Sequence, residues 1–442
     1  MLKKLASSIK KDFKEESFLE IISGSAATFL IRLLGLIVGY AFTFLISRYY
    51  GSQVLGAHTL SVTVLMMFSV IGRMGMDTHL VKNFAKDHAD GRWDKILEVY
   101  KKTTMVIIPV GLILSVILYF SSGLIAQYIF NKPFLEPYFK IISFAVLPMV
   151  MRFINSECYR GFRRNKEYAY SQNVGYLLYA SVILGIFSIF DRNALLPNIA
   201  FAASLFLLTF SSSFLILKEI KSHSKISADS LPVADMIRHS LPMMLATSLL
   251  LISGWLNTIM LGIWSTETDV GIYSVILKIS TLSTFVLMSI NSIAAPRFAQ
   301  LHAKGNKEGL NIYVGQISKV IFFSSIPIFL FIIIFRDWLL DLFGEEFVIG
   351  SQALLITMIG QFFNVFAGSV GAILNMTGHQ VAFRNILGIS TIINIIACVI
   401  FIPLYGLMGS AIAGMIFMGC WNLISMVYIK MKFNIKTYFW PF

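Results

Sequence analysis

The stretch IISGSAATFLIRLLGLIVGYAFTFLIS at residues 21–47 contains a single charged residue, Arg32. A helix rises about 1.5 Å per residue, so this stretch is long enough to cross the roughly 30 Å hydrocarbon core of a membrane. It is too long for the core of a signal peptide, and we interpret it as a retained first span. Similar apolar blocks follow along the whole chain. The twelve predicted spans are residues 20–47, 55–77, 99–121, 138–160, 170–190, 196–217, 239–264, 270–295, 312–335, 351–376, 382–403 and 407–430.

The composition agrees with a membrane protein and excludes a soluble one. Of the 442 residues, 57% are hydrophobic and 13% are charged, and the mean hydropathy is +0.76. So few charged side chains cannot cover a soluble particle of this size. Cys158, Cys398 and Cys420 lie in or beside apolar segments without the spacing of a metal site or a disulfide framework. We therefore expect no metal and no cofactor.

The placement of the basic residues predicts the orientation. If the N-terminus is cytoplasmic, the inside segments hold 27 of the 36 Lys and Arg residues, the outside loops hold five, and four lie within spans. Short cytoplasmic loops are enriched in Lys and Arg, so this asymmetry predicts that both termini are cytoplasmic. The same placement accounts for the net charge of +13 without a nucleic-acid partner.

The two halves of the sequence resemble each other at one offset along the chain. KDHADGRWDKILEVY at 86–100 matches QLHAKGNKEGLNIYV at 300–314, and GSQVLGAHTLSV at 51–62 resembles STETDVGIYSV at 265–275. We call the offset from position 86 to position 300 the repeat offset. Because each half contains six spans, equivalent helices have the same orientation. This predicts two parallel six-helix repeats related by an axis along the membrane normal.

The repeat also predicts how the chain is divided. The N-terminal bundle covers residues 1–217, a cytoplasmic linker covers 218–238, and the C-terminal bundle covers 239–442.

Three loops carry a family resemblance. FLISRYYGSQVLGAH at 44–58 resembles the R-x-x-G-x-x-x-x-G loop of polysaccharide-export proteins in the multidrug/oligosaccharidyl-lipid/polysaccharide superfamily. MGMDTHLVKNFAKDHADG at 74–91 and ECYRGFRRNKEYAYSQNVG at 157–175 resemble the loops after the second and fourth spans of that family. In length and pattern the chain is most similar to Wzx-type flippases.

This resemblance implies a fold and a function. The implied fold is MATE-like, with a central cavity lined chiefly by the first two spans of each half. The implied activity is transfer of an undecaprenyl-pyrophosphate-linked oligosaccharide, the repeat unit of O-antigen lipopolysaccharide or another surface polysaccharide, from the cytoplasmic to the periplasmic leaflet of the bacterial inner membrane. The implied partners are this lipid-linked oligosaccharide, membrane lipid, and a polysaccharide polymerase with its chain-length machinery.

Arg32 is the leading candidate for substrate binding. It lies near the middle of the first span, where a charge costs about 2.5–3.5 kcal/mol on insertion scales and therefore needs a partner. Gly35 and Gly39 form a small face beside it, suited to close packing or to a cavity wall. The functional interpretation is a guanidinium that binds a pyrophosphate or a uronic carboxylate bidentately. The alternative is a structural Arg that binds carbonyls of a neighbouring helix.

Lys278 and Arg152 are further candidates for substrate binding. Lys278 lies in the eighth span, the repeat of the second, where it faces either the cavity or the outer surface. Arg152 lies in the inner half of the fourth span beside Asn155 and Glu157, which favours a structural polar cluster. If Arg32, Lys278 and Arg152 all face the cavity, they form a staggered basic track for an anionic head group.

Three other polar features have a functional and a structural interpretation. Arg73 and Asp77 are four residues apart, the spacing of an ion pair within a helix, and they serve either structure or gating of the cytoplasmic entrance. Asn257 and Trp255 in the seventh span are candidates for sugar binding by hydrogen bonding and stacking. For Asn257, a hydrogen bond between helices is the more common role.

Other functions remain as alternatives. A MATE-type drug or metabolite antiporter resembles this chain in size, but such proteins export cations and carry buried carboxylates, whereas no Asp or Glu lies near the middle of a predicted span here. A lipid II flippase has an equally anionic substrate but, by resemblance, two additional spans. A membrane glycosyltransferase or polymerase needs carboxylates at the outer face, and the first outside loop contains none. We therefore expect a transporter and not an enzyme.

Overall fold

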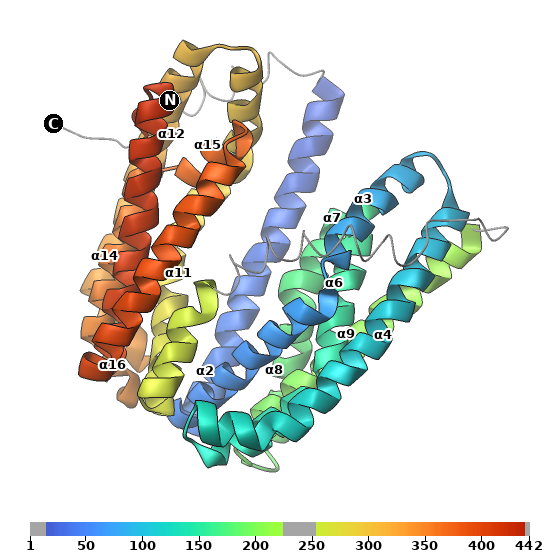
Figure 1. The fold of residues 1–442 in the computed structure, drawn as a ribbon, viewed down its shortest axis with the longest axis vertical. Coiled ribbons are helices and arrows are strands. Elements are labelled where there is room, and N and C mark those ends of the chain that lie inside the picture. The colour runs from blue at the N-terminus through green and yellow to red at the C-terminus, as the bar shows by residue number, and fades with distance from the viewer. Residues whose placement is uncertain (1–14, 224–252, 438–442) are drawn as a thin grey trace. The chain divides into compact units, whose positions relative to one another are not determined.

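The computed structural model describes residues 15–223 and 253–437, and within these ranges the chain forms helices and no strand (Figure 1). A helical segment over residues 253–264 precedes α11. In chain order the elements are α2 (Glu15–Arg73), α3 (Met76–Ala89), α4 (Trp93–Leu124), η1 (Ile125–Ile129), η2 (Pro133–Leu135), α5 (Glu136–Ser143), α6 (Val146–Gly161), α7 (Asn165–Ala169), η3 (Tyr170–Val174), α8 (Gly175–Phe187), α9 (Leu196–His223), α11 (Glu267–Ala303), α12 (Lys307–Ile334), α13 (Arg336–Asp341), η4 (Glu345–Gly350), α14 (Ser351–Ala367), α15 (Val370–Met376) and α16 (Gln380–Phe433).

The described helices have the length and apolar character of membrane spans. Seven of them are long and apolar enough to cross a membrane, and a pair bent by 47° at residues 133–161 raises the number to eight. Two of the seven, α2 and α16, each cover two predicted spans. Helical residues make up most of each predicted span within the described ranges. The predicted all-α polytopic membrane architecture is thus confirmed, and the described helices are consistent with twelve spans in two repeats.

Glycines break the two longest helices at the predicted junctions between spans. Gly51 in α2 has φ 81° and Gly406 in α16 has φ 51°, and both lie in or beside the junctions predicted at 47–55 and 403–407. A residue without a side chain adopts these positive φ values with little steric cost. Each break therefore separates two spans that the chain connects without a loop.

The described residues divide into two compact units. The first contains residues 15–45, 64–126 and 133–223, and the second contains residues 46–63, 127–132 and 253–437. The second unit therefore includes the middle of α2, the end of η1 and the connection that follows it. The predicted boundaries at 217 and 239 remain a prediction, because residues 224–252 lie outside the described ranges.

In the first unit, α4, α6 and α9 lie side by side and α3 packs against α4 and α6 (Figure 1). Their apolar side chains form a core in which Leu80, Phe84, Ile154 and Cys158 are fully buried. Gly161 permits the close approach of α6 to α3, since a Cβ there would lie 2.5 Å from the Cβ of Phe84. This core fixes the end of α6 that carries the arginines described below.

In the second unit, α14 packs along α16, and α11 packs along α12 and α14 (Figure 1). Gly360 brings the backbones of α14 and α16 together, because a Cβ there would lie 2.9 Å from the Cα of Met415. Gly368, with φ 72°, ends α14 and separates it from α15. The tenth predicted span is therefore broken near its inner end, which the apolar pattern does not indicate.

Candidate functional site

Two guanidinium groups of the first unit share one aromatic ring. The Cζ atom of Arg73 lies 4.1 Å from the centre of the Phe153 ring, and the Cζ atom of Arg152 lies 4.3 Å from the same centre. The face of an aromatic ring attracts a cation, and this attraction grows where water is excluded. The ring of Phe153 on α6 therefore contacts both Arg73, at the end of α2, and the buried Arg152.

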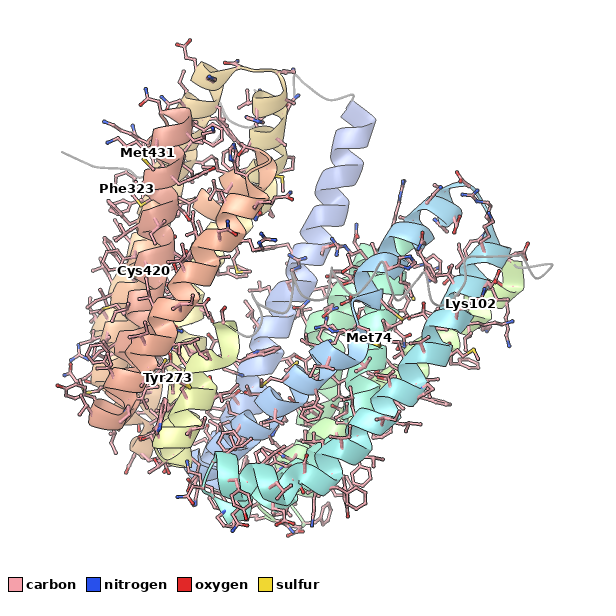
Figure 2. The ribbon with its side chains drawn as sticks, viewed as in Figure 1. Met74, Lys102, Tyr273, Phe323, Cys420 and Met431 are labelled. Atoms are coloured by element: carbon pink, nitrogen blue, oxygen red, sulfur yellow. The ribbon has the colours of Figure 1, made fainter. Side chains whose placement is uncertain are left out.

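Arg73 also forms the predicted ion pair with Asp77. Arg73 Nη1 lies 2.9 Å from Asp77 Oδ2, and both side chains are mostly buried. The helix does not continue between the two residues, because Met74 and Gly75 have φ values of 49° and 72° and separate α2 from α3. Figure 2 labels Met74 at this break. The pair therefore connects two helices across a hinge-like break, whereas its spacing indicates a single helix.

Arg152 is almost completely buried and is hydrogen-bonded within the first unit. Its side chain is 2% exposed, and Nη1 donates hydrogen bonds to the backbone oxygens of Ser171 at 3.0 Å and Gln172 at 3.3 Å. Both acceptors belong to η3, a π-helical turn, where the backbone hydrogen bonds of an α-helix are displaced. The guanidinium also lies 4.6 Å from the centre of the Tyr176 ring. These contacts give Arg152 structural partners in η3, and its predicted part in substrate binding stays a prediction.

Arg32 lies on α2 beside the same segment. Its side chain is exposed, while Gly35, one turn further along, packs against η3. A Cβ on Gly35 would lie 2.7 Å from the Cβ of Asn173, so the small face serves close packing at this point. Arg32 is therefore held next to η3 by the helix contact and keeps its guanidinium accessible.

Tyr168 lies among three of the positive charges. Burial raises the pKa of the Tyr168 hydroxyl, and the Glu157 carboxylate adds to that rise. The guanidinium groups of Arg160, Arg32 and Arg152 oppose the rise in this pKa, so all three act on the one side chain. Arg160 Cζ lies 5.7 Å from the centre of the Tyr168 ring.

We call this group of side chains the basic–aromatic cluster. It contains four arginines and three aromatic residues, accompanied by the carboxylates of Asp77 and Glu157. Four guanidinium groups against two carboxylates leave a formal charge of +2. The members are Arg32, Arg73, Arg152, Arg160, Phe153, Tyr168 and Tyr176.

The sequence did not single out the aromatic members of the cluster. Phe153 and Tyr176 lie in apolar spans where aromatic residues are common, and only the fold shows that each faces a guanidinium. Tyr168 lies in the loop motif at 157–175 that carries the family resemblance, and the same motif contains Arg160 and Arg164. An aromatic residue directly after a buried arginine, as Phe153 follows Arg152, was the available signal.

Asn257 of the second unit holds helices together. Its Nδ2 donates to the Ser410 backbone oxygen at 3.1 Å and to the Tyr273 hydroxyl at 3.4 Å, and its Oδ1 accepts from Asn394 Nδ2 at 2.7 Å. Figure 2 labels Tyr273, which lies on α11. These bonds join the 253–264 helix to α11 and α16. Trp255 lies half-buried on the same helix as Asn257.

Lys278 lies half-buried on α11 in the second unit. The carbonyl of Lys278 accepts a hydrogen bond from Thr281 Oγ1 at 2.7 Å. Because Arg32 and Arg152 belong to the first unit, the basic track through all three charges stays a prediction. Within residues 15–223 and 253–437, no group of three His, Cys, Asp or Glu residues is arranged to hold a metal ion.

Known proteins resemble the chain in sequence. The polysaccharide biosynthesis protein family matches residues 20–302, and the MatE family matches residues 242–400. The probable low-salt glycan biosynthesis flippase Agl15 of Haloferax volcanii is 28% identical over 163 residues, which cover 36% of this chain and 34% of that protein. The match thus spans about a third of that relative. A membrane protein of Methanocaldococcus jannaschii is 21% identical over 371 residues, covering 78% of this chain and 71% of that protein.

Solved structures share the fold. A multidrug resistance MATE family transporter of the MOP superfamily, in an inward-facing conformation, matches with a TM-score of 0.74 and 16% identity over 92% of this chain and 98% of that chain. The lipid II flippase MurJ, in an inward closed conformation, matches with a TM-score of 0.72 and 17% identity over 92% of this chain and 87% of that chain. Because the polysaccharide biosynthesis protein family matches more than half of the residues, the chain belongs to that family, within the multidrug/oligosaccharidyl-lipid/polysaccharide transporter superfamily.

Proposed function

We propose that the protein is a flippase that moves an undecaprenyl-pyrophosphate-linked oligosaccharide from the cytoplasmic to the periplasmic leaflet by alternating access. The oligosaccharide is the repeat unit of O-antigen or of another surface polysaccharide. The observation that carries this proposal is the basic–aromatic cluster of the first unit, in which guanidinium groups outnumber carboxylates. Family membership and the flippase name of the Haloferax volcanii relative support the same class of substrate.

The cluster suits a pyrophosphate. A guanidinium presents a planar fork of N–H donors that matches two phosphate oxygens, and it stays charged at any physiological pH. Arg32 is exposed, whereas the donors of Arg152 are directed to the carbonyls of η3. We therefore assign direct phosphate binding to Arg32 and a supporting electrostatic role to Arg152.

Arg73 is the second candidate for phosphate contact, in a gating role. Its ion pair with Asp77 closes the break between α2 and α3, and an incoming phosphate competes with the Asp77 carboxylate for the same guanidinium. Exchange of one anion for the other loosens the connection between the two helices. This step links arrival of the substrate to movement at the predicted cytoplasmic end.

The charge of the cluster disfavours a drug antiporter. A site with excess positive charge repels a cationic drug and attracts a phosphate. A lipid II flippase is the nearer alternative, because a pyrophosphate head group meets the same arginines and MurJ shares the fold. The two flippases therefore differ in the oligosaccharide that they recognise. Asn257 and Trp255 remain proposed sugar contacts, but they are weaker candidates than Arg32, because the hydrogen bonds of Asn257 are made between helices.

As such a flippase, the protein lies in the bacterial inner membrane with both termini in the cytoplasm. Its partners are the lipid-linked oligosaccharide, surrounding lipid, and the polymerase and chain-length machinery that consume the product. The transporters and flippases among the relatives accord with a protein that moves its substrate without a chemical step.

Reconstitution tests the proposal. The purified full-length protein is incorporated into vesicles that contain a fluorescent undecaprenyl-pyrophosphate oligosaccharide, and appearance of the label in the other leaflet is followed with a membrane-impermeant quencher. We expect transfer by the wild type and its loss in Arg32→Gln, with normal transfer in Arg192→Gln, the same change at an exposed arginine of a loop. Equal transfer of lipid II favours the alternative flippase, and transfer of a cationic dye without the lipid contradicts the proposal.

A further inference from the structure

Two helices of the second unit touch backbone to backbone at a pair of glycines. A Cβ on Gly56 of α2 would lie 1.7 Å from the Glu267 backbone oxygen, and a Cβ on Gly271 of α11 would lie 2.1 Å from the Ser52 backbone oxygen. The two glycines are separated by the same number of positions as Ser52 and Glu267. This separation is one position longer than the repeat offset. The contact is therefore reciprocal between equivalent positions, so a local two-fold axis passes between the two glycines.

Lys132 holds one side of this crossing. Its Nζ donates to the Gly262 backbone oxygen at 2.9 Å and to the Ser265 backbone oxygen, and it lies 3.8 Å from Glu267 Oε2. The side chain of Lys132 is 13% exposed. One carbonyl lies in the last turn of the 253–264 helix and the other directly after it, where unpaired carbonyls and the helix dipole favour a positive charge.

Glu346 holds the other side. Its Oε1 accepts a hydrogen bond from the Ser52 backbone N–H at 2.6 Å, and its Oε2 accepts one from the Ser52 hydroxyl at 2.8 Å. Ser52 is the first residue after the break at Gly51, so its N–H belongs to the start of a helical segment. A carboxylate at this end of a helix satisfies an unpaired donor and is favoured by the helix dipole.

Lys132 and Glu346 occupy equivalent places in the two repeats, because the repeat offset relates position 132 to position 346. Each lies in the loop after the third span of its own half and reaches the junction between the first two spans of the other half. Their charges are opposite because Lys132 meets carbonyls at the end of a helix and Glu346 meets an N–H at the start of one.

Further contacts follow the same pattern. Arg48 donates to the backbone oxygens of Leu342 at 2.9 Å and Asp341 at 3.1 Å, beside the Glu346 contact. Gln53 Nε2 donates to Glu267 Oε1 at 2.8 Å, beside the Lys132 contact. The charge pattern predicts that this end of the second unit faces outside, so these contacts join the outer ends of the two halves.

We propose that Lys132 and Glu346 are a matched pair of latches that keep the outer ends of the two halves closed over the Gly56–Gly271 crossing. Each latch binds a helix terminus of the opposite half, and both release when the outer side opens. The place of the latches in a transport cycle rests on the proposed function, whereas the latches themselves rest on the contacts above. The closed and open states are in equilibrium, and loss of a contact made only in the closed state shifts the population toward the open one.

Spin-label distances test the latches in the full-length protein. Cysteines replace Tyr128 and Ile349, which are 75% and 77% exposed and lie in the two latch-bearing loops, and Cys420 is replaced by alanine. Double electron–electron resonance in nanodiscs then reports the separation of the outer ends without any substrate. This readout is independent of the substrate, so failure of the latches and failure of the proposed function are distinguishable.

We expect a short-distance population in the parent protein and an added longer-distance population in Glu346→Ala and in Lys132→Met. The matched controls are Glu345→Ala, an exposed acid next to Glu346, and Lys140→Met, a lysine that pairs with Glu136 of its own helix. Lys132→Arg keeps the donors and should keep the short distance. The double variant Lys132→Glu with Glu346→Lys should show a larger long-distance population than Glu346→Ala or Lys132→Met, because each helix end then faces a charge of the unfavourable sign.

Monodisperse elution and an unchanged melting temperature establish that the variants are folded. Distance distributions of Glu346→Ala and Lys132→Met that match the parent protein would overturn the latches. An equal shift in the control variants would overturn them as well, because it would show that any charge change in these loops separates the outer ends. Restoration of the short distance by the double charge exchange would indicate a direct pairing of the two side chains and would contradict binding to helix ends.

Discussion

Arg73 and Arg152 place their guanidinium carbons 4.1 Å and 4.3 Å from the centre of the same ring, that of Phe153. Two cations held this close repel each other unless the surroundings compensate. Asp77 pairs with Arg73, and the carbonyls of η3 accept hydrogen bonds from Arg152. The remaining positive charge of the basic–aromatic cluster includes Arg32, which is exposed, as is Arg160 near the end of α6.

Replacement of Arg32 by glutamine should lower transport strongly. Glutamine can still donate one hydrogen bond to a phosphate, so the change removes one charge-assisted hydrogen bond worth about 1.5–3 kcal/mol, and we expect a loss of about tenfold to a hundredfold in transport rate. Arg32→Lys keeps the charge without the planar fork and should retain intermediate transport. Initial rates in vesicles at matched protein content provide the measurement. Full activity of Arg32→Gln would remove Arg32 from the site.

Replacement of Arg152 should affect stability before transport. Arg152→Met leaves the carbonyls of Ser171 and Gln172 without their donor and removes the contacts with Phe153 and Tyr176. We expect the free energy of unfolding to fall by about 2–4 kcal/mol. Thermal unfolding of the purified variant in detergent, without substrate, measures this effect. A variant of normal stability that fails only in transport would assign Arg152 to substrate contact instead.

Substitution of Gly56 by alanine should prevent the close crossing of α2 and α11. The added methyl group would lie 1.7 Å from the Glu267 backbone oxygen, and backbone atoms cannot yield as a flexible side chain does. Gly271→Ala should have the same effect, because the contact is reciprocal. The suitable control is Gly185→Ala in α8, where a Cβ would have no neighbour within 4 Å. Outer-end distances from spin labels should lengthen in the first two variants only, and a short distance in Gly56→Ala would refute the crossing.

His379 should make stability depend on pH. Burial lowers the pKa of His379, and the positive charges of Lys432 and His302 lower it further. At pH values just below the ordinary histidine pKa of about 6.5, the folded protein therefore binds fewer protons than the unfolded chain. The free energy of unfolding should thus fall as the pH is lowered below about 6.5, and His379 should have no effect on it at higher pH. His379 also lies 2.9 Å from the Tyr428 hydroxyl through Nδ1.

Melting temperatures at pH 5.5 and 7.5 measure this dependence, and His379→Gln should reduce the difference between them. His223→Gln serves as the control, because His223 is exposed and stacks on Trp93 at a centroid distance of 4.4 Å. An unchanged pH dependence in His379→Gln would show that other groups cause it.

The sequence predicted the spans well because the membrane imposes a strong constraint on length and polarity. The first span, the break at Gly51 and the Arg73–Asp77 pair all follow from local patterns of apolar residues, glycine and charge. The packing of Gly35 against η3 likewise follows from a small residue within an apolar helix. These features depend on residues that are close together in the chain.

Contacts between distant segments could not be predicted in the same way. Nothing local to Phe153 indicates that Arg73, far earlier in the chain, lies over its ring. The π-helical turn η3 has no sequence signal, and so the carbonyl partners of Arg152 were hidden. Lys132 and Glu346 lie in predicted outside loops, where charged residues are common, and the repeat offset between their positions was the available clue.

The flippase function is tested most plainly by the leaflet in which the lipid-linked oligosaccharide resides in cells. A strain that lacks the gene is complemented with the wild type, Arg32→Gln or Arg192→Gln at matched protein levels, and the oligosaccharide exposed on the periplasmic face is labelled with an impermeant reagent. We predict accumulation on the cytoplasmic side in the deletion strain and with Arg32→Gln, and outward display with the wild type and Arg192→Gln. Unchanged outward display in the deletion strain would contradict a flippase function.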